Sequence, residues 1–328
     1  MYELSYLVPS FNRQYFLRRL VFSLSDYNVE VIIVDGSRED WGNGLRGCLR
    51  RLDWKYIHMP GELNYFERLK VGLENASGHY VCILDDQDMF FPNVHFELIR
   101  ESKKLSGFIS VACAMAGLDY KQDFPKLVKL GHYSEPFEAK QENGLSRVKS
   151  VIENKRTASF YYQPIQKKYL EEFLEAVLPV IKRRRPEWLG WAEFAFAIFL
   201  ANKGYLVVRK DIGWVRRINP HHHVREFREE IKLWPSEYDI DALFEIFKNS
   251  SEDSISQISD NKESFTKILK QSHEFMLPQN PILITKITRI VLKLPRYVWE
   301  QFKTKLLKLA RKLFLNLNLK SFHPRCRK

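Results

Sequence analysis

Three aspartates stand close together at Asp85, Asp86 and Asp88, directly after the apolar run from Tyr80 to Leu84. The run predicts a buried strand, so the carboxylates should lie where that strand ends. Like charges this close repel one another, and their presence indicates a cation held at this place. A divalent metal ion that carries a phosphate group is the simplest such partner.

Two earlier strand ends also carry polar groups. Buried strands are predicted at Leu4–Pro9 and Val29–Val34, with a helix of apolar periodicity at Tyr15–Leu24 between them. This βαβ unit implies parallel strands, whose carboxyl ends bind ligands at one rim of the sheet. One carboxylate at a strand end often only caps a helix, but three converging segments favour a binding site. The polar residues at the first two strand ends are Ser10, Asn12, Arg13, Asp35 and Ser37.

The remaining periodic segments continue the alternation of strands and helices, which predicts an α/β fold with a mostly parallel central sheet and flanking helices. Further strands are expected at Trp54–His58, Phe108–Ala116, Arg156–Phe160 and Tyr205–Arg209. Further helices are expected at Tyr65–Asn75, Asn93–Leu105, Lys167–Ile181 and Ser264–Met276, a loop at Asp211–His223, and a Ser-rich linker at Asn249–Glu263.

A candidate base lies in the helix predicted at Glu187–Lys203, which is strongly apolar and aromatic and ends at Gly204. We expect Gly204 to close this helix in the left-handed conformation. Glu193 is the only carboxylate in the middle of the helix. A mid-helix acid usually faces solvent, but apolar neighbours on nearly every side favour a pocket and a raised pKa, which suits a general base.

The segment N-P-H-H-H, which ends at His223, offers nitrogen ligands for a metal. Three adjacent histidines cannot all point in one direction, so at most two would bind the same ion. His221 and His223 are the candidates, and a plain surface loop is the alternative.

The net charge of +12 is concentrated in one part of the chain. Residues 281–328 contain thirteen Lys/Arg and one acidic residue, Glu300, whereas the remaining residues are balanced in charge. This distribution argues against a general polyanion binder. From Trp299 onward apolar residues recur every three or four positions between Lys and Arg, which predicts a basic amphipathic helix suited to an anionic membrane surface. A helix packed on the body is one alternative, and nucleic acid is disfavoured because no nucleic-acid motif accompanies the charge.

Cysteine use and the N-terminus bear on localisation. The four cysteines show no paired spacing, which is typical of reduced thiols in a cytoplasmic protein. The chain enters a predicted strand at Leu4 without a signal-peptide pattern, and no apolar run is long enough to cross a bilayer. We therefore expect a cytoplasmic protein that is peripheral at the inner face of the membrane through its tail.

Four segments in a fixed order resemble family 2 glycosyltransferases of GT-A fold, of the bacterial surface-polysaccharide type. They are L-V-P-S-F-N-R, V-I-I-V-D-G-S, F-E-R-L-K-V-G-L-E-N-A-S-G-H-Y-V and I-L-D-D-Q-D-M-F-F-P. The resemblance covers roughly residues 4–120, and it continues more loosely through W-A-E-F-A-F-A-I-F-L-A-N-K-G-Y. The chain from about residue 230 lies outside it.

The resemblance implies a role for each matching residue. Nucleotide-sugar-binding roles fall on Pro9, Ser10, Asn12, Arg13, Asp35, Gly36, Ser37, Lys70, Asp85 and Asp86, with Asp35 hydrogen-bonded to the base, usually uracil. Asp86 and Asp88 would hold Mn²⁺ or Mg²⁺ on the diphosphate, and Glu193 takes the position of the catalytic base. The family pattern D-x-D-D places a metal-binding aspartate where this chain has Gln87, so the frame Asp86-Gln87-Asp88 is the alternative D-x-D.

Together these features predict an inverting, metal-dependent glycosyltransferase of cell-surface polysaccharide biosynthesis. Its donor is a nucleotide-diphosphate sugar, usually UDP-linked, and its acceptor a hydroxyl of a glycan or lipid-linked molecule. The expected organisation is a donor half at 1–120, an acceptor and base half at 121–248, a linker and helix at 249–280 and the membrane-surface tail at 281–328. A sugar-phosphate nucleotidyltransferase is one alternative function. It is disfavoured because such enzymes need a Gly-rich loop with Arg and Lys after the first strand, where this chain has P-S-F-N-R. A non-catalytic nucleotide-sugar-binding relative is the other alternative, because of Gln87.

Overall fold

The computed structural model describes residues 2–42, 44, 54–61, 64–119, 126–129, 131–183, 190–218, 236–250 and 262–276. Residues 1–276 form one compact unit, and residues 277–328 are a second. The basic tail and most of the Ser-rich linker lie outside the described residues. The predicted boundaries at residues 120 and 248 fall within the first unit, and the division into donor and acceptor halves remains a prediction.

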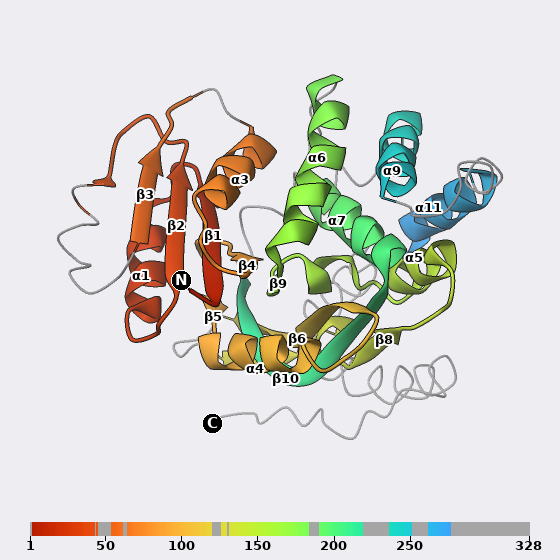
Figure 1. Ribbon diagram of the computed structural model, residues 1–328, viewed down its shortest axis with the longest axis horizontal. Helices are drawn as coiled ribbons and strands as arrows, with labels where there is room; N and C mark the ends of the chain where they lie inside the picture. Colours follow the sequence, from red (N-terminus) through yellow and green to blue (C-terminus); the bar gives the residue numbers. More distant parts are fainter. Residues whose placement is uncertain are drawn as a thin grey trace, which may run out of the picture. The chain divides into compact units, whose positions relative to one another are not determined.

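The first sheet contains the strands that the N-terminal sequence predicts (Figure 1). Its order is β3 (Trp54–His58), β2 (Glu30–Asp35), β1 (Leu4–Ser10), β4 (Tyr80–Ile83) and β9 (Ile165–Gln166). The first four strands are parallel, and β9 is antiparallel to β4. Helix α1 (Gln14–Leu24) connects β1 to β2, and α3 (Tyr65–Glu74) packs on both strands. The mostly parallel α/β prediction is confirmed for this sheet.

A second, mixed sheet follows, and it contains the strand predicted from Phe108. Its order is β5 (Met89–Phe90), β10 (Tyr205–Ile218), β6 (Phe108–Asp119) and β7 (Lys126–Lys129), with β8 (Phe137–Ala139) also paired to β10. Strands β10 and β6 are parallel, whereas β5, β7 and β8 pair antiparallel. Helix α4 (Pro92–Ser102) packs on β6 and β10.

The loop predicted from Asp211 is wrong as far as Ile218, because β10 continues through it. Two register shifts between Val208 and Trp214 interrupt the alternation that normally marks a strand. Gly213 breaks the pattern for a packing reason, since a Cβ there would lie 2.4 Å from the Sγ of Cys113. Residues 219–223 lie outside the described part of the chain.

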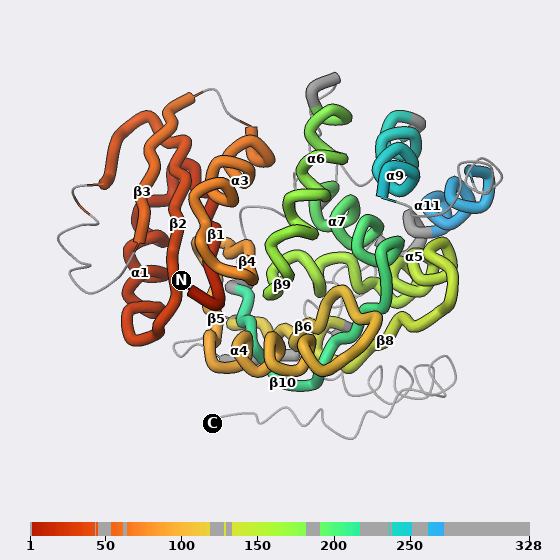
Figure 2. The backbone as a smooth tube through the Cα atoms, viewed as in Figure 1, coloured from red at the N-terminus to blue at the C-terminus, as the bar shows by residue number. Residues whose placement is uncertain are grey.

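The helices beyond the first sheet form a layer in which α7 is central (Figure 2). The layer contains α5 (Gly144–Glu153), α6 (Lys167–Arg183), α7 (Gly190–Lys203), α9 (Glu237–Asn249) and α11 (Lys262–Met276). Helix α7 contacts α5, α6 and α9. The short strand predicted at Arg156–Phe160 is wrong: Thr157–Phe160 is a 3₁₀ turn whose four side chains are all buried, with Ser159 N donating to Arg156 O at 3.0 Å.

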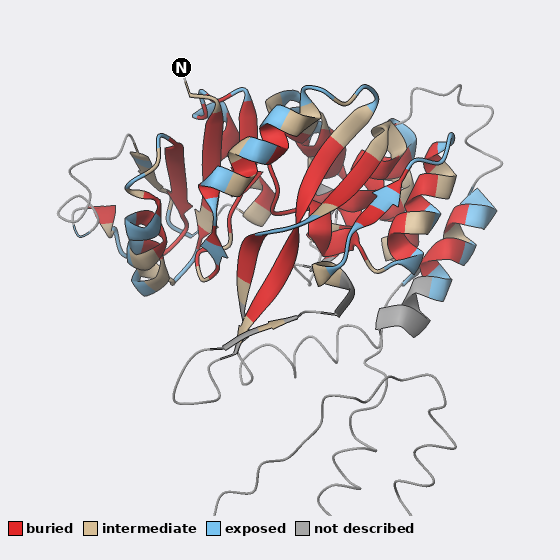
Figure 3. Ribbon diagram, turned by 90° about the horizontal axis from the view of Figure 1, so that it is seen from below, coloured by how far each residue is buried: buried red, intermediate tan, exposed pale blue. Residues whose placement is uncertain are grey.

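Burial follows the strands and the centre of the helical layer (Figure 3). Helix α7 is buried on nearly all sides, as its sequence predicts. Gly204 does not take the expected left-handed conformation; a Cβ there would lie 2.5 Å from Ile109 Cγ1, so close packing on β6 requires the glycine. Cys82 and Cys113 are buried free thiols. Among the described helices, none combines the length and apolar character needed to span a bilayer.

Candidate active site

The carboxyl ends of β1, β2 and β4 meet at one edge of the first sheet, as the sequence predicts. Ser10 pairs with Asp35 in the parallel register of β1 and β2, and β4 lies on the other side of β1. The Ser10 hydroxyl donates to Asp86 at 2.9 Å, which links the end of β1 to the aspartate cluster. Three separate segments therefore bring their polar groups to one rim.

The turn after β1 holds this rim together through Asn12. Asn12 has a φ of 56°, in the left-handed region that asparagine tolerates better than most residues. This conformation lets the Asn12 N–H donate to the Ser37 hydroxyl at 2.7 Å. Gly36 N in turn donates to Ser10 O at 3.0 Å, beyond Pro9 at the end of β1. The predicted nucleotide-framing segment thus has a defined backbone shape, and Asn12 is needed for that shape.

Asp35 is fully buried and oriented by several donors. Its carboxylate accepts from Ser37 N at 2.9 Å, from the Ser37 hydroxyl and from the Tyr56 hydroxyl at 2.8 Å. Multiple donors stabilise a buried carboxylate and fix its direction. The sequence does not reveal the contribution of Tyr56, which lies on β3 next to β2.

Helix α3 brings Arg68 to the rim, whereas Lys70 lies on its exposed side. Asn64 and Glu67 form a capping box that fixes the start of α3. The Arg68 guanidinium lies over the Phe11 ring at 5.8 Å, and a Cβ on Gly36 would lie 2.9 Å from Arg68 Nη1. The Lys70 ammonium is 3.8 Å from Glu74 on the solvent-exposed face. Of these two cations, Arg68 is the one beside the predicted nucleotide-binding residues.

Asp85 and Asp86 share one cation that the chain itself supplies. Arg13 Nη1 lies 3.4 Å from Asp85 and 3.2 Å from Asp86. Burial raises the pKa of Asp86 to about 7, and the charge of Asp85 adds to this shift, while Arg13 and the Ser10 hydroxyl oppose it. The pair is therefore a partly neutralised carboxylate cluster at the edge of the first sheet.

Asp88 belongs to different surroundings from its two neighbours in sequence. Its carboxylate accepts from Trp214 Nε1 at 2.8 Å and lies 4.0 Å from Arg216 Nε. Both partners come from β10, which pairs antiparallel with β5. The short strand β5 thus carries the chain from the first sheet to the second, and Asp88 lies at that transition.

Glu193 lies within reach of the same arginine. Its carboxylate is 3.6 Å from Arg216 Nη2, and the side chain is 15% exposed. Burial raises the pKa of Glu193; Arg216 and a hydrogen bond from Tyr162 oppose the shift, and the charge of Asp85 adds to it. Arg216 thus links the acid on α7 to Asp88 of the acidic motif.

Aromatic side chains surround this arginine. The Arg216 guanidinium lies 5.4 Å from the Trp214 ring and 5.9 Å from the Tyr162 ring. Burial lowers the pKa of Arg216, but the neighbouring acidic groups, Glu193 first and then Tyr162, Asp88 and Asp85, together outweigh this and raise the pKa above its ordinary value. Arg216 therefore stays charged between Glu193 and Asp88.

The described carboxylates of the predicted metal site are paired with groups of the protein. Asp85 and Asp86 are paired with Arg13, and Asp88, which is 1% exposed, is engaged by Trp214 and Arg216. In the described residues, no group of three His, Cys, Asp or Glu is placed to hold a metal ion. His221 and His223 lie outside the described residues.

Five residues of this site were not predicted from the sequence: Tyr56, Arg68, Tyr162, Trp214 and Arg216. The last two lie in the segment assigned to a loop. Their spacing of two residues is a strand signal, since side chains at i and i+2 share a face, but the irregular register before Trp214 hides it. Nothing in the sequence pattern distinguishes Arg68 from Lys70 on α3.

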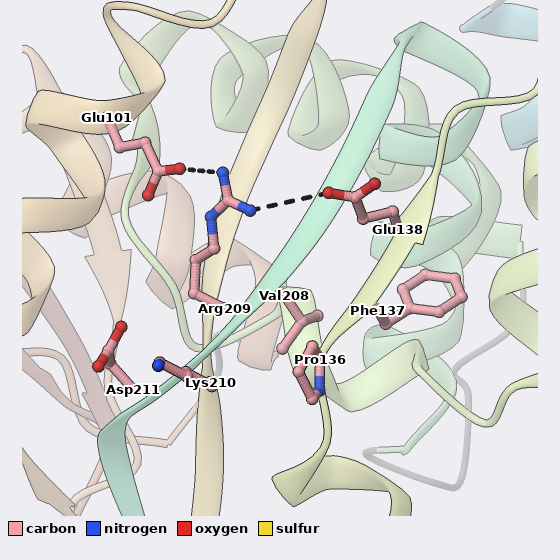
Figure 4. Close-up of a pocket in the computed structure, with 8 residues that line it drawn as sticks. All are labelled: Glu101, Pro136, Phe137, Glu138, Val208, Arg209, Lys210 and Asp211. Atoms are coloured by element: carbon pink, nitrogen blue, oxygen red, sulfur yellow. Dashed lines mark hydrogen bonds and ion pairs between the residues drawn. The ribbon is translucent and has the colours of Figure 1, made fainter.

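A pocket of about 610 Å³ outside this site has different chemistry (Figure 4). None of the residues that line it was predicted to bind the donor or to act as the base. Arg209 points between Glu101 and Glu138 and is ion-paired with both. The positive charge of Arg209 in this pocket is thus already neutralised by two glutamates of the protein. The candidate active site therefore remains the rim of the first sheet together with Glu193.

Comparison with known proteins identifies the N-terminal part of the chain. Residues 5–151 match the model of glycosyl transferase family 2. Over this segment the chain is similar to that family. It contains the β1, β2 and β4 ends with their polar groups, so the resemblance found in the sequence motifs is confirmed.

Individual relatives agree with the family 2 assignment. Over 136 residues the chain is 26% identical to an uncharacterized glycosyltransferase of Rickettsia bellii (strain RML369-C), a match that covers 40% of this chain and 19% of that protein. The chain thus matches about a fifth of that relative's length. The structure of S. aureus TarS 1-349 in complex with UDP is similar at a TM-score of 0.51 and 16% identity, covering 92% of this chain and 78% of TarS. That likeness shows a shared GT-A fold.

Proposed function

We propose that this protein is an inverting glycosyltransferase that moves a sugar from a UDP-linked donor to a hydroxyl of a glycan or lipid-linked acceptor. The observation that carries the proposal is the largely buried Glu193, which Arg216 links to Asp88 of the acidic motif. The family 2 match supports the reaction class, and the TarS structure of the same fold holds UDP.

The chemistry follows from the residue types. Breaking a sugar–diphosphate bond develops negative charge on the leaving phosphate and positive charge on the sugar. Arg13 and Arg68 are two cations beside the predicted nucleotide-binding residues. Glu193 accepts the proton of the acceptor hydroxyl as it attacks the anomeric carbon from the opposite face, which inverts the configuration in one displacement. A pKa raised by burial makes this carboxylate a stronger base than an exposed glutamate.

The first experiment is a screen of UDP-, GDP- and other nucleotide sugars for thermal stabilisation and for release of the nucleoside diphosphate. A stabilising donor that is also hydrolysed or transferred supports the proposal. Binding of UDP with neither hydrolysis nor transfer would instead favour the non-catalytic relative, which Gln87 and the Arg13-paired aspartates keep open.

Glu193→Gln tests the base directly. With the donor found in the screen, we expect kcat to fall by about 10²–10⁴-fold, the usual contribution of a general base. The Kd for UDP should stay within about twofold, because the amide keeps the size of the side chain. Glu175→Gln, an exposed change on α6, is the matched control and should leave both constants unaltered. Equal losses of transfer and of UDP binding would contradict the base assignment.

Two further proposals concern cofactor and location. Mn²⁺ or Mg²⁺ dependence remains a prediction from the sequence, and UDP calorimetry with EDTA or with Mn²⁺ tests it. The basic amphipathic segment from Trp299 supports a peripheral protein on the cytoplasmic side of an anionic membrane, acting in surface-polysaccharide synthesis. Co-sedimentation with vesicles of anionic or neutral lipid tests it: binding only to the anionic vesicles is expected, and equal binding to both would contradict it.

A further inference from the structure

The acidic motif divides between two networks, and this division gives Asp88 a role of its own. In the antiparallel pairing of β5 with β10, Trp214 lies opposite Phe90 and Val215 opposite Met89. Continuing this register by one residue brings Arg216 to Asp88. The pairing of the two strands therefore fixes the aspartate beside the arginine, independently of any bound ligand.

Asp88 is a buried carboxylate whose contacts are made by side chains of β10. Its carboxylate accepts the indole N–H of Trp214 at 2.8 Å and lies 4.0 Å from Arg216 Nε. The Asp88 side chain is 0% exposed, and the Trp214 ring stacks on Phe90 with an interplanar angle of 4°. A buried carboxylate needs charged and hydrogen-bonding partners, and here β10 supplies both.

Arg216, which Asp88 holds in place, also contacts Glu193. Arg216 Nη2 is 3.6 Å from the Glu193 carboxylate, while its guanidinium rests against the Trp214 and Tyr162 rings. One guanidinium thus joins two acids that are more than 100 residues apart in the chain. Its planar, multi-donor head can contact both at once, which an ammonium group does less well.

We propose that Asp88, acting through Arg216 and Trp214, positions the Glu193 carboxylate and is not a metal ligand. The inference rests on the proposed function of Glu193 as the base. Asp88 is then a positioning residue: it fixes the arginine that holds the base in place. The D-D-Q-D segment of this chain separates accordingly, with Asp85 and Asp86 on the donor side and Asp88 on the base side.

Asp88→Asn tests the proposal with the donor found in the screen. The amide keeps an oxygen that accepts from Trp214 and removes the charge that faces Arg216. We expect kcat to fall about tenfold or more, while the KM for the donor and the Kd for UDP stay within about twofold. The Kd should be equally unaffected in EDTA and in Mn²⁺. Asp211→Asn, a change of an exposed aspartate on β10, is the matched control.

Two more variants separate positioning from folding. Trp214→Phe removes the indole donor and keeps an aromatic ring against Phe90; it should reproduce the loss of kcat with the protein still folded. In a Glu193→Gln background, Asp88→Asn should cause no further loss, because residues that act through one group are not additive. Full additivity would overturn the proposal.

The remaining outcomes are also decisive. Loss of UDP affinity in Mn²⁺ but not in EDTA on Asp88→Asn would make Asp88 a metal ligand and overturn the inference. An unaltered kcat would do the same. If Glu193→Gln keeps full activity, or no nucleotide sugar binds, the proposed function itself fails. If Glu193→Gln is inactive and Asp88→Asn is fully active, only the positioning role fails.

Discussion

The donor side and the base side of this site are built in different ways. On the donor side, polar residues follow strands of one parallel sheet, and their hydrogen bonds join neighbouring strand ends such as Ser10 and Asp86. On the base side, Glu193 comes from α7 and its arginine from β10, and the bond from Trp214 to Asp88 joins residues 126 positions apart. The first arrangement depends on local motifs, and the second depends on the packing of two sheets and a helix.

The largest expected effect is on the base side. Trp214→Ala removes a fully buried ring that contacts Phe90, Tyr162 and Asp88, so the free energy of unfolding should fall by about 3–5 kcal/mol. Urea denaturation measures this. Tyr15→Ala, on an exposed α1 position, should stay within about 0.5 kcal/mol of the wild type. Similar losses for both variants would contradict the packing account.

Arg216→Gln should change the pH dependence of transfer. Glu193 must be unprotonated to act, and burial already raises its pKa, so activity falls as the pH drops through that value. Arg216 opposes the shift; its removal raises the pKa further and moves the acid limb of the kcat/KM profile to higher pH. We also expect kcat to fall by about 10²-fold, as for other losses of base function.

Arg216→Lys is the control for this profile, because it retains the charge. Its acid limb should move less than that of Arg216→Gln. An identical profile for the wild type and both variants would show that Arg216 does not set the protonation of Glu193.

Substitution of one glycine on each side, Gly204 and Gly36, tests how tightly each side is packed. Gly204→Ala would place a Cβ 2.5 Å from Ile109 Cγ1 and 3.0 Å from Gly107 O, so it should destabilise the protein by about 1–3 kcal/mol. Gly36→Ala meets the end of the Arg68 side chain at 2.9 Å and the exposed Phe11 ring at 3.3 Å; both side chains can move, so this change should cost clearly less. Melting temperatures of the two variants measure the difference, and the reverse order would contradict it.

The smallest expected effect is on the donor side. Arg13→Gln leaves Asp85 and Asp86 without their shared cation, so UDP should bind about tenfold more weakly, the scale of one charged hydrogen bond. Calorimetry in EDTA measures the Kd, with the exposed Arg18→Gln as control. Unaltered affinity would mean that Arg13 only neutralises the aspartates and does not aid the donor.

The difference between the sides explains what the sequence could predict. The parallel strands, the helices between them and the meeting of Ser10, Asp35 and Asp86 follow from periodicity and from the rule that ligands gather at strand ends. Glu193 was predicted as the base because a single acid inside an apolar helix is unusual. These are local properties of the chain.

Arg216 and Trp214 were missed for a physical reason. The bulged register of β10 and the close contact at Gly213 remove the alternation by which a strand is recognised. The separation of Asp88 from Asp86 was also not predictable, because it depends on the pairing of β5 with a strand more than 100 residues later. Whether His221 and His223 bind a metal stays a prediction.

Each of the two sheets contains one buried thiol, Cys82 on β4 and Cys113 on β6. Burial raises the pKa of both thiols, that of Cys113 to about 12. Neither thiol therefore reacts readily with a thiol reagent at neutral pH while the strand that carries it stays folded. Their modification rates therefore report local opening, one sheet at a time. In a Cys48→Ser, Cys326→Ser background, pulsed labelling followed by mass spectrometry would give separate opening rates for the donor strand and for the strand beside β10.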